Sequence, residues 1–206
     1  MQNLTFMYVS TQLRTRANKL TFRVRNQKCD PESANAIFSN TQLSNRITLI
    51  ALDLSHQVLA TPAILEMLLH PLNLQVPPGS PENTTPLRKM LHDLLTFFAS
   101  TYAAVFNITE GPPLHDPLAV AAVLPCPILA TLHQKSSSAG GIQFEWEYVK
   151  VVVDIHGVEI GRTQKHAPKE GETVVRVAKA VDVQKFWEVL MDAVGKADAR
   201  GKVKWV

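Results

Sequence analysis

His115 and Asp116 place an imidazole and a carboxylate side by side at the predicted start of a helix. A carboxylate in that position could hold a hard cation while the neighbouring histidine donates a proton. The preceding segment, from Gly111 to Leu114, contains two prolines and is too stiff to be an ordinary flexible loop. A plainer interpretation is that Asp116 only caps the helix and His115 is a bystander. Adjacency alone does not decide between the two.

Other signatures of catalysis are missing. The sequence has no G-x-S-x-G elbow, H-E-x-x-H pair, Walker loop, zinc-type Cys/His spacing or G-x-G-x-x-G after a strand. His56 follows a predicted strand. It either orders the turn by packing and hydrogen bonding or lies behind the site residues and holds them in place, and we favour the structural role in the turn. Tyr102 lies in an apolar helical stripe, which favours core packing over contact with a substrate.

Four predicted helices share one kind of start, a capping side chain followed by proline at the first helical position. The pairs Asp30-Pro31, Thr61-Pro62, Thr85-Pro86 and Asp116-Pro117 predict helices over about 31–38, 62–69, 86–105 and 117–124. In the third, apolar residues recur at steps of three, four and one, which predicts a core-facing helix; they are Leu87, Met90, Leu91, Leu94, Leu95, Phe98, Tyr102 and Val105.

The predicted strands lie between and after these helices. The continuous apolar run 47–54 is typical of a strand buried on both faces of a parallel sheet. After a small-residue loop at 136–141, segments 148–155 and 158–163 predict a hairpin, and 173–181 a further strand. Asp182 caps a final amphipathic helix that Gly195 should end, leaving a tail over 196–206. Strands alternating with helices indicate an α/β fold.

Charge is divided unevenly along the 206 residues. Residues 1–28 carry six basic and no acidic side chains, whereas the rest carries 15 basic and 18 acidic ones. No apolar run approaches the ~20 residues of a membrane span, so we expect no membrane association. With Cys29 and Cys126 as the two cysteines and no secretory segment, a reducing compartment such as the cytoplasm is expected. Nucleic acid binding ranks last, because no aromatic residues interleave with the basic ones as in a binding platform.

Four segments, in order, resemble the inosine/uridine-type ribonucleoside hydrolases, and two of them resemble fungal uridine nucleosidases in particular. These segments are CDPESANAIFSN from Cys29, ITLIALDLSHQVLATP from Ile47 with Ser55 where threonine is usual, TEGPPLHDPLAVAA from Thr109, and the ending, with GRT at Gly161–Thr163 and VDVQKFW at Val181–Trp187. The resemblance covers about Cys29 to Val194. It implies a partial nucleoside-hydrolase fold, with a mostly parallel sheet flanked by helices, a C-terminal β-hairpin and a final helix. The expected division is a basic segment outside the family over 1–28, disordered or not genuine, the hydrolase part over 29–195, and the tail.

The resemblance also implies the chemistry. Members of this family hydrolyse the N-glycosidic bond of ribonucleosides and hold a calcium ion in the active-site cleft. By resemblance, Asp116 would be a calcium ligand and His115 the general acid on the side of the leaving base, a role that an ordinary histidine pKa near ~6.5 suits. The residues that bind the substrate are not identified; Asn26 aligns with a ribose-contacting asparagine, but Val24 stands where its partner glutamate belongs, so we regard the match as coincidence.

The family's aspartate-rich motif, D-x-D-x-x-x-D-D, is missing from this sequence. We therefore expect a ribonucleoside hydrolase by family whose calcium site is incomplete and which is inactive as this chain. The alternative is a non-catalytic remnant that binds a partner, such as a full-length paralogue or a second copy of itself, through an exposed sheet edge. The basic segment 1–28 has three interpretations, which are a misread exon boundary, a mitochondrial transit peptide and, last, a nucleic-acid arm.

Overall fold

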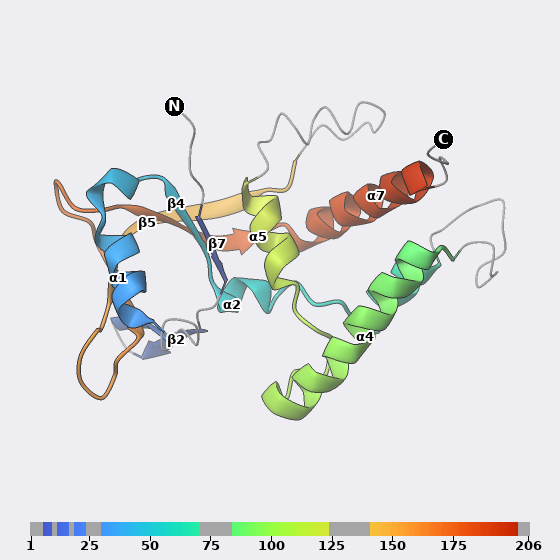
Figure 1. Cartoon of the computed structure of the whole chain (residues 1–206), viewed down its shortest axis with the longest axis horizontal. Coiled ribbons are helices and arrows are strands. Elements are labelled where there is room, and N and C mark those ends of the chain that lie inside the picture. Colours follow the sequence, from blue (N-terminus) through green and yellow to red (C-terminus); the bar gives the residue numbers. More distant parts are fainter. Residues whose placement is uncertain are drawn as a thin grey trace. The chain divides into compact units, whose positions relative to one another are not determined.

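The computed structural model describes residues 6–9, 12–16, 19–23, 30–70, 84–123 and 141–201 (Figure 1). The chain divides into two compact units. Unit 1 comprises residues 1–57 and 115–182, and unit 2 comprises residues 58–114 and 183–206. Each unit is therefore assembled from segments that lie far apart in the sequence. Among the described residues, no helix has the length and apolar character needed to span a membrane.

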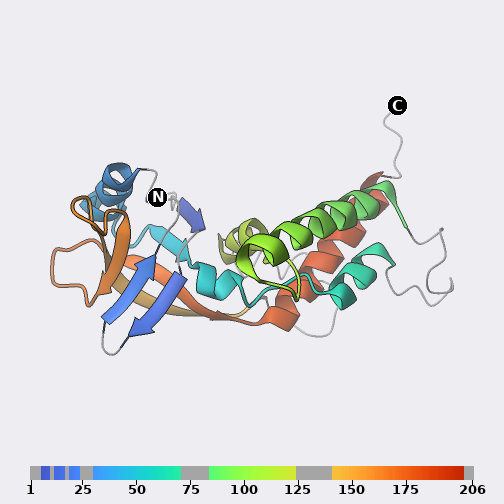
Figure 2. The same ribbon diagram turned by 90° about the horizontal axis from the view of Figure 1, so that it is seen from below.

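Unit 1 is built on a sheet to which the described residues contribute seven strands. In spatial order its strands are β1 (Phe6–Val9), β4 (Ile47–Ile50), β7 (Val175–Val181), β5 (Phe144–Val153), β6 (Arg162–His166), β3 (Lys19–Arg23) and β2 (Gln12–Arg16). Strands β1, β4 and β7 are parallel neighbours, and the remaining pairs are antiparallel. Figure 2 shows the blue strands β2 and β3 side by side. The α/β class with its C-terminal hairpin is confirmed, but the sheet is mixed rather than mostly parallel, because short connections join β2 to β3 and β5 to β6.

The basic segment contributes to this sheet. Strands β1, β2 and β3 all lie within residues 1–28, which the sequence assigned to a separate segment. Val24, Asn26 and both cysteines lie outside the described residues, as do most of the predicted loop at 136–141 and the end of the tail.

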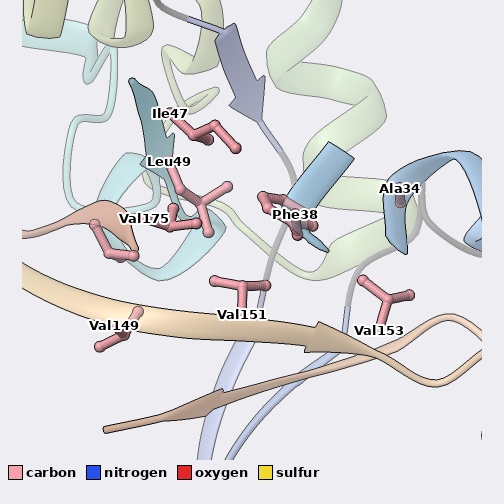
Figure 3. Packing of buried hydrophobic residues seen from close by; sticks show 9 residues of the cluster. Ala34, Phe38, Ile47, Leu49, Val149, Val151, Val153 and Val175 are labelled. Carbon is pink, nitrogen blue, oxygen red and sulfur yellow. The ribbon is translucent and has the colours of Figure 1, made fainter. Parts of the chain in front are cut away.

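The core of unit 1 forms where helix α1 (Pro31–Ser39) packs on the sheet. Every residue of β4 is buried, as expected for a strand covered on both faces. In β5 the buried residues alternate along the strand, and Figure 3 shows Val151 and Val153 on the face toward Phe38 and Ala34. The buried cluster comprises Ala34, Phe38, Ile47, Leu49, Val149, Val151, Val153, Val175 and Val177.

The predicted strand 47–54 was too long. Strand β4 ends at Ile50, and residues Leu52–Ser55 form the short helix α2. Local hydrogen bonds turn the chain there, because the His56 amide donates to the Leu52 carbonyl at 2.8 Å and the Ser55 hydroxyl lies 3.1 Å from the same oxygen. A continuous apolar run indicates burial, but it does not distinguish a buried strand from a buried helical turn.

The proline starts are confirmed for three helices. Asp30 caps α1, Thr61 caps α3 (Pro62–Leu69) and Thr85 caps α4 (Pro86–Phe106), each accepting a backbone N–H three residues ahead. The fourth start was wrong by two residues, since α5 runs from His115 to Val123. Asp116 therefore lies in the first turn of α5 rather than at its cap.

The hairpin and the final helix also differ from the prediction at their ends. The two hairpin strands are β5 and β6, and residues 154–161 join them. Helix α7 (Val183–Gly201) passes Gly195 without ending, so residues 196–201 are helical rather than a tail. Lys196 pairs with Asp192 one turn earlier at 2.6 Å, which favours continuation of the helix.

In unit 2, an ion pair joins α4 to α7. The Arg88 guanidinium is buried and donates through Nε to Asp198 at 2.5 Å and through Nη1 to the Leu68 carbonyl at 2.7 Å. The Thr85 hydroxyl donates to the other oxygen of Asp198 at 2.6 Å. One arginine therefore connects α4, α7 and the end of α3.

The prediction that α4 faces the core was wrong. Arg88 is the buried residue of this helix, whereas much of its apolar side is exposed. The exposed apolar face of α4 comprises Met90, Leu94, Phe97, Phe98, Val105 and Phe106. Periodicity established that the helix is amphipathic, and it could not establish that a partner covers it.

Candidate functional site

Helices α2 and α5 bring Ser55, His56 and His115 together within unit 1. The Ser55 hydroxyl oxygen lies 2.7 Å from Nδ1 of His115, although the two residues are 60 positions apart in the sequence. The rings of His56 and His115 lie 5.7 Å apart between centroids and are tilted by 50°. The sequence singled out both histidines separately, and the structure places them beside each other.

Burial controls the electrostatics of the two histidines. Desolvation lowers the pKa of His115 from its ordinary value of 6.5, and the nearby His56 lowers it further, while Asp116 opposes the shift. Desolvation also lowers the pKa of His56. At neutral pH, His115 is therefore mainly a neutral imidazole, whose protonated form is a stronger acid than an exposed histidine. This differs from the ordinary pKa assumed from the sequence.

Asp116 follows His115 in the first turn of α5, and its side chain is exposed. A carboxylate suits calcium chemically, but calcium in proteins takes about six to eight oxygen ligands. In the described parts of the chain, no group of three or more His, Cys, Asp or Glu side chains could hold a metal ion. The residues described here therefore do not build a calcium site around Asp116.

The stiff segment before His115 is held within unit 2 by a short backbone ladder. The Ala60 amide donates to the Pro112 carbonyl at 2.9 Å, and the Leu114 amide donates to the Val58 carbonyl at 2.9 Å. Gly111 has a positive φ of 143°, and a Cβ there would lie 2.3 Å from the Ala60 carbonyl oxygen. A glycine is required at this close approach of two backbones. The expectation of a constrained rather than flexible segment is met.

Tyr102 belongs to unit 2, where its ring lies 5.3 Å from that of Phe106. Its side chain is half-buried.

Sequence reasoning missed the contact between Ser55 and His115. The signal that could have found it is the polar Ser55 directly after an apolar run, because a hydroxyl in buried surroundings needs a hydrogen-bond partner. Its partner could not be identified from the sequence, since the contact depends on the packing of α2 and α5.

Comparison with protein families gives a match to the model of the inosine-uridine preferring nucleoside hydrolases over residues 15–188. This match begins within the basic segment 1–28 and extends close to the middle of α7.

Individual relatives agree. The chain is 26% identical over 171 residues to a uridine nucleosidase of Saccharomyces cerevisiae, covering 82% of this chain and 46% of that protein. It is 28% identical over 167 residues to an inosine-uridine preferring nucleoside hydrolase of Crithidia fasciculata, covering 80% and 43%. The chain thus spans about half the length of the relatives it matches.

Two solved structures have a similar fold. A plant nucleoside hydrolase matches with a TM-score of 0.54 at 24% identity, covering 81% of this chain and 46% of that one. A purine-preferring ribonucleoside hydrolase from Gardnerella vaginalis matches with a TM-score of 0.55 at 24% identity, covering 81% and 44%.

Proposed function

Because the chain belongs to the inosine-uridine preferring nucleoside hydrolase family, we propose that its site is built to hydrolyse the N-glycosidic bond of ribonucleosides to ribose and a free base. The observation that carries this proposal is the position of His115. This histidine stands next to the carboxylate of Asp116 at the start of α5, with Ser55 and His56 beside its ring.

His115 is proposed to act on the leaving base. Cleavage of an N-glycosidic bond places negative charge on the departing base, and a proton donor there stabilises that charge. The lowered pKa of His115, caused by its desolvation, makes its protonated form the stronger donor but the less populated one at neutral pH. We therefore expect the donor function to strengthen toward mildly acidic pH.

Asp116 is the one residue of the proposed site to which we assign a role in calcium binding. Its carboxylate would be one ligand of a calcium ion, and the other ligands would have to come from groups other than the described side chains near it. We derive no step of the reaction through the metal.

We further propose that the 206-residue chain alone does not hydrolyse nucleosides, because a single carboxylate can neither complete a calcium site nor activate water. The test incubates the purified chain with uridine or inosine and calcium, and measures released uracil or hypoxanthine. Calcium-dependent release that His115→Ala abolishes and His166→Ala leaves intact would contradict the proposed inactivity; His166 is an exposed histidine at the end of β6.

Nucleoside recognition is tested separately from turnover. We expect millimolar uridine or inosine to shift the NMR signals of the His115 ring, whereas free ribose-5-phosphate and the His166 ring serve as ligand and residue controls. Unchanged His115 signals at saturating nucleoside would count against a nucleoside site.

A second candidate function, a non-catalytic protein that associates with a partner or another copy of itself, is favoured by the exposed apolar face of α4. Phe97 is 66% exposed on this face. Sedimentation velocity of the chain should then show association that Phe97→Asp reduces and that Thr96→Asp, at an exposed position on the opposite side of α4, does not reduce. A monomer at all concentrations would remove this candidate.

For location in the cell we propose the cytoplasm, with the mitochondrion as the alternative if the basic segment 1–28 acts as a transit peptide. Imaging of a C-terminal fluorescent fusion, with and without residues 1–28, distinguishes the two.

A further inference from the structure

Ser55 has a single hydroxyl proton and, among the residues that the structure describes, two polar neighbours within hydrogen-bond distance. Its oxygen lies 3.1 Å from the Leu52 carbonyl oxygen and 2.7 Å from Nδ1 of His115. Its residue is fully buried, so water does not offer the hydroxyl an alternative partner. The directions of these two hydrogen bonds are therefore linked.

A carbonyl oxygen can only accept hydrogen bonds. If the Ser55 hydroxyl donates to the Leu52 carbonyl, its oxygen is left to accept, and the group at 2.7 Å must then donate. That donor is the Nδ1–H of His115. The opposite arrangement, with Ser55 donating to Nδ1, would leave two oxygens facing each other at 3.1 Å without a proton between them.

We propose that Ser55 is a positioning residue for His115, whose buried hydroxyl accepts the Nδ1–H and holds the ring in one tautomer and one orientation. In a neutral imidazole with Nδ1 protonated, the lone pair is on Nε2, and Nε2 is the atom that takes up and releases the second proton. The inference that this proton serves a departing base rests on the proposed function. The inferred tautomer and ring orientation do not depend on the proposed function.

The elements that carry the two residues suit this role. Ser55 is at the end of α2, directly after the buried strand β4, and His115 is the first residue of α5. Both helices belong to unit 1, and Leu54 and Leu118 beside the contact are almost fully buried. The Ser55 hydroxyl is thus held by a hydrogen bond within its own helix as well as by its contact with the His115 imidazole.

The test is the tautomer of His115, read from the ring nitrogen chemical shifts in a long-range proton–nitrogen NMR spectrum of the labelled chain. It is recorded at about pH 8, where a histidine with an ordinary or lowered pKa is neutral. We expect the Nδ1–H tautomer in the unaltered chain and in Ser55→Thr, which keeps the hydroxyl. In Ser55→Ala the ratio should move toward Nε2–H by about threefold to tenfold, as expected for loss of one hydrogen bond.

The spectrum of the unaltered chain decides the proposal even where Ser55→Ala fails to fold. A predominantly Nε2–H ring in the unaltered chain would overturn the proposal. A tautomer ratio of His115 that Ser55→Ala leaves unchanged would overturn it as well. The ring of the exposed His166 serves as the reference that should stay constant in every variant. The nucleoside experiments do not affect this readout. An Nδ1–H ring in a chain whose His115 signals do not respond to nucleoside supports the positioning role and counts against the proposed nucleoside site.

Discussion

Replacing Gly111 by alanine tests whether the backbone ladder before His115 needs a glycine. The new Cβ would lie 2.3 Å from the Ala60 carbonyl oxygen and 2.7 Å from its carbon. Real Cβ contacts essentially never fall under 3.0 Å, so the two backbones would have to separate by about 0.7 Å at the oxygen. Neither contacting atom belongs to a flexible side chain that could move aside.

The expected cost has two parts. Holding alanine at a φ of 143° costs about 1–3 kcal/mol. Separation of the backbones weakens the bonds from Ala60 to Pro112 and from Leu114 to Val58, at about 0.5–1.5 kcal/mol each. We therefore expect Gly111→Ala to destabilise this ladder by about 3 kcal/mol or more, against a typical stability of about 5–15 kcal/mol.

Hydrogen exchange of the Ala60 and Leu114 amides is the assay, because these two N–H groups make the ladder bonds. A loss of about 3 kcal/mol corresponds to exchange about a hundredfold faster. Gly157→Ala and Gly171→Ala are matched controls, since both glycines have positive φ but a Cβ would meet nothing within 4 Å. These should cost about 1–2 kcal/mol in unit 1 and leave the two amides protected. Unchanged protection in Gly111→Ala would refute the reasoning.

Three further predictions follow from contacts in each unit. Asp198→Ala should lower the free energy of unfolding by about 3–5 kcal/mol in denaturant titrations, because it leaves the buried Arg88 guanidinium without its carboxylate partner. The double variant Arg88→Met with Asp198→Leu should recover most of this loss, and equal losses in the single and double variants would contradict the prediction. Desolvation lowers the pKa of His115 and of His56 below 6.5 in the folded chain, so these histidines take up protons at a higher pH in the unfolded chain. Their contribution to stability is therefore full above about pH 6.5 and is lost as the pH falls below it. Denaturation at several pH values should show a slope of the unfolding free energy against pH that His115→Gln reduces. Asp116 supplies one carboxylate, so calorimetry should give a calcium Kd weaker than about 1 mM; tighter binding that Asp116→Asn abolishes would reveal a complete site.

Local features were predictable from the sequence because local physics sets them. The caps at Asp30, Thr61 and Thr85 depend on one side chain and the next few amides, and all three form as expected. The burial of β4 followed from its continuous apolar run. His115 was singled out because it precedes Asp116 and Pro117 at a predicted helix start, and the role assigned to it came from the family resemblance and stays a prediction.

Features that depend on contacts across the chain were not predictable. The hydrogen bond between Ser55 and His115 joins residues 60 positions apart, and burial, which lowers the His115 pKa, is a property of the packed unit. The exposure of Phe97 and its neighbours on α4 contradicted a clear helical period, because a period describes one helix and not what lies against it. Gly195 was expected to end α7, but the helix continues past it to residues that pair with α4.

The pairing of β4 with β7 sets the order in which unit 1 can form. Thr48 and Arg176 pair in register on these strands although they are 128 positions apart in the sequence, and β7 lies between β4 and β5 in the sheet. A ribosome must therefore synthesise most of the chain before β4 meets its partner, and closing so long a loop makes folding slow. During synthesis, the apolar surface of β4 and α1 stays exposed until β7 has been made, so this interval is when the nascent chain most needs protection from aggregation.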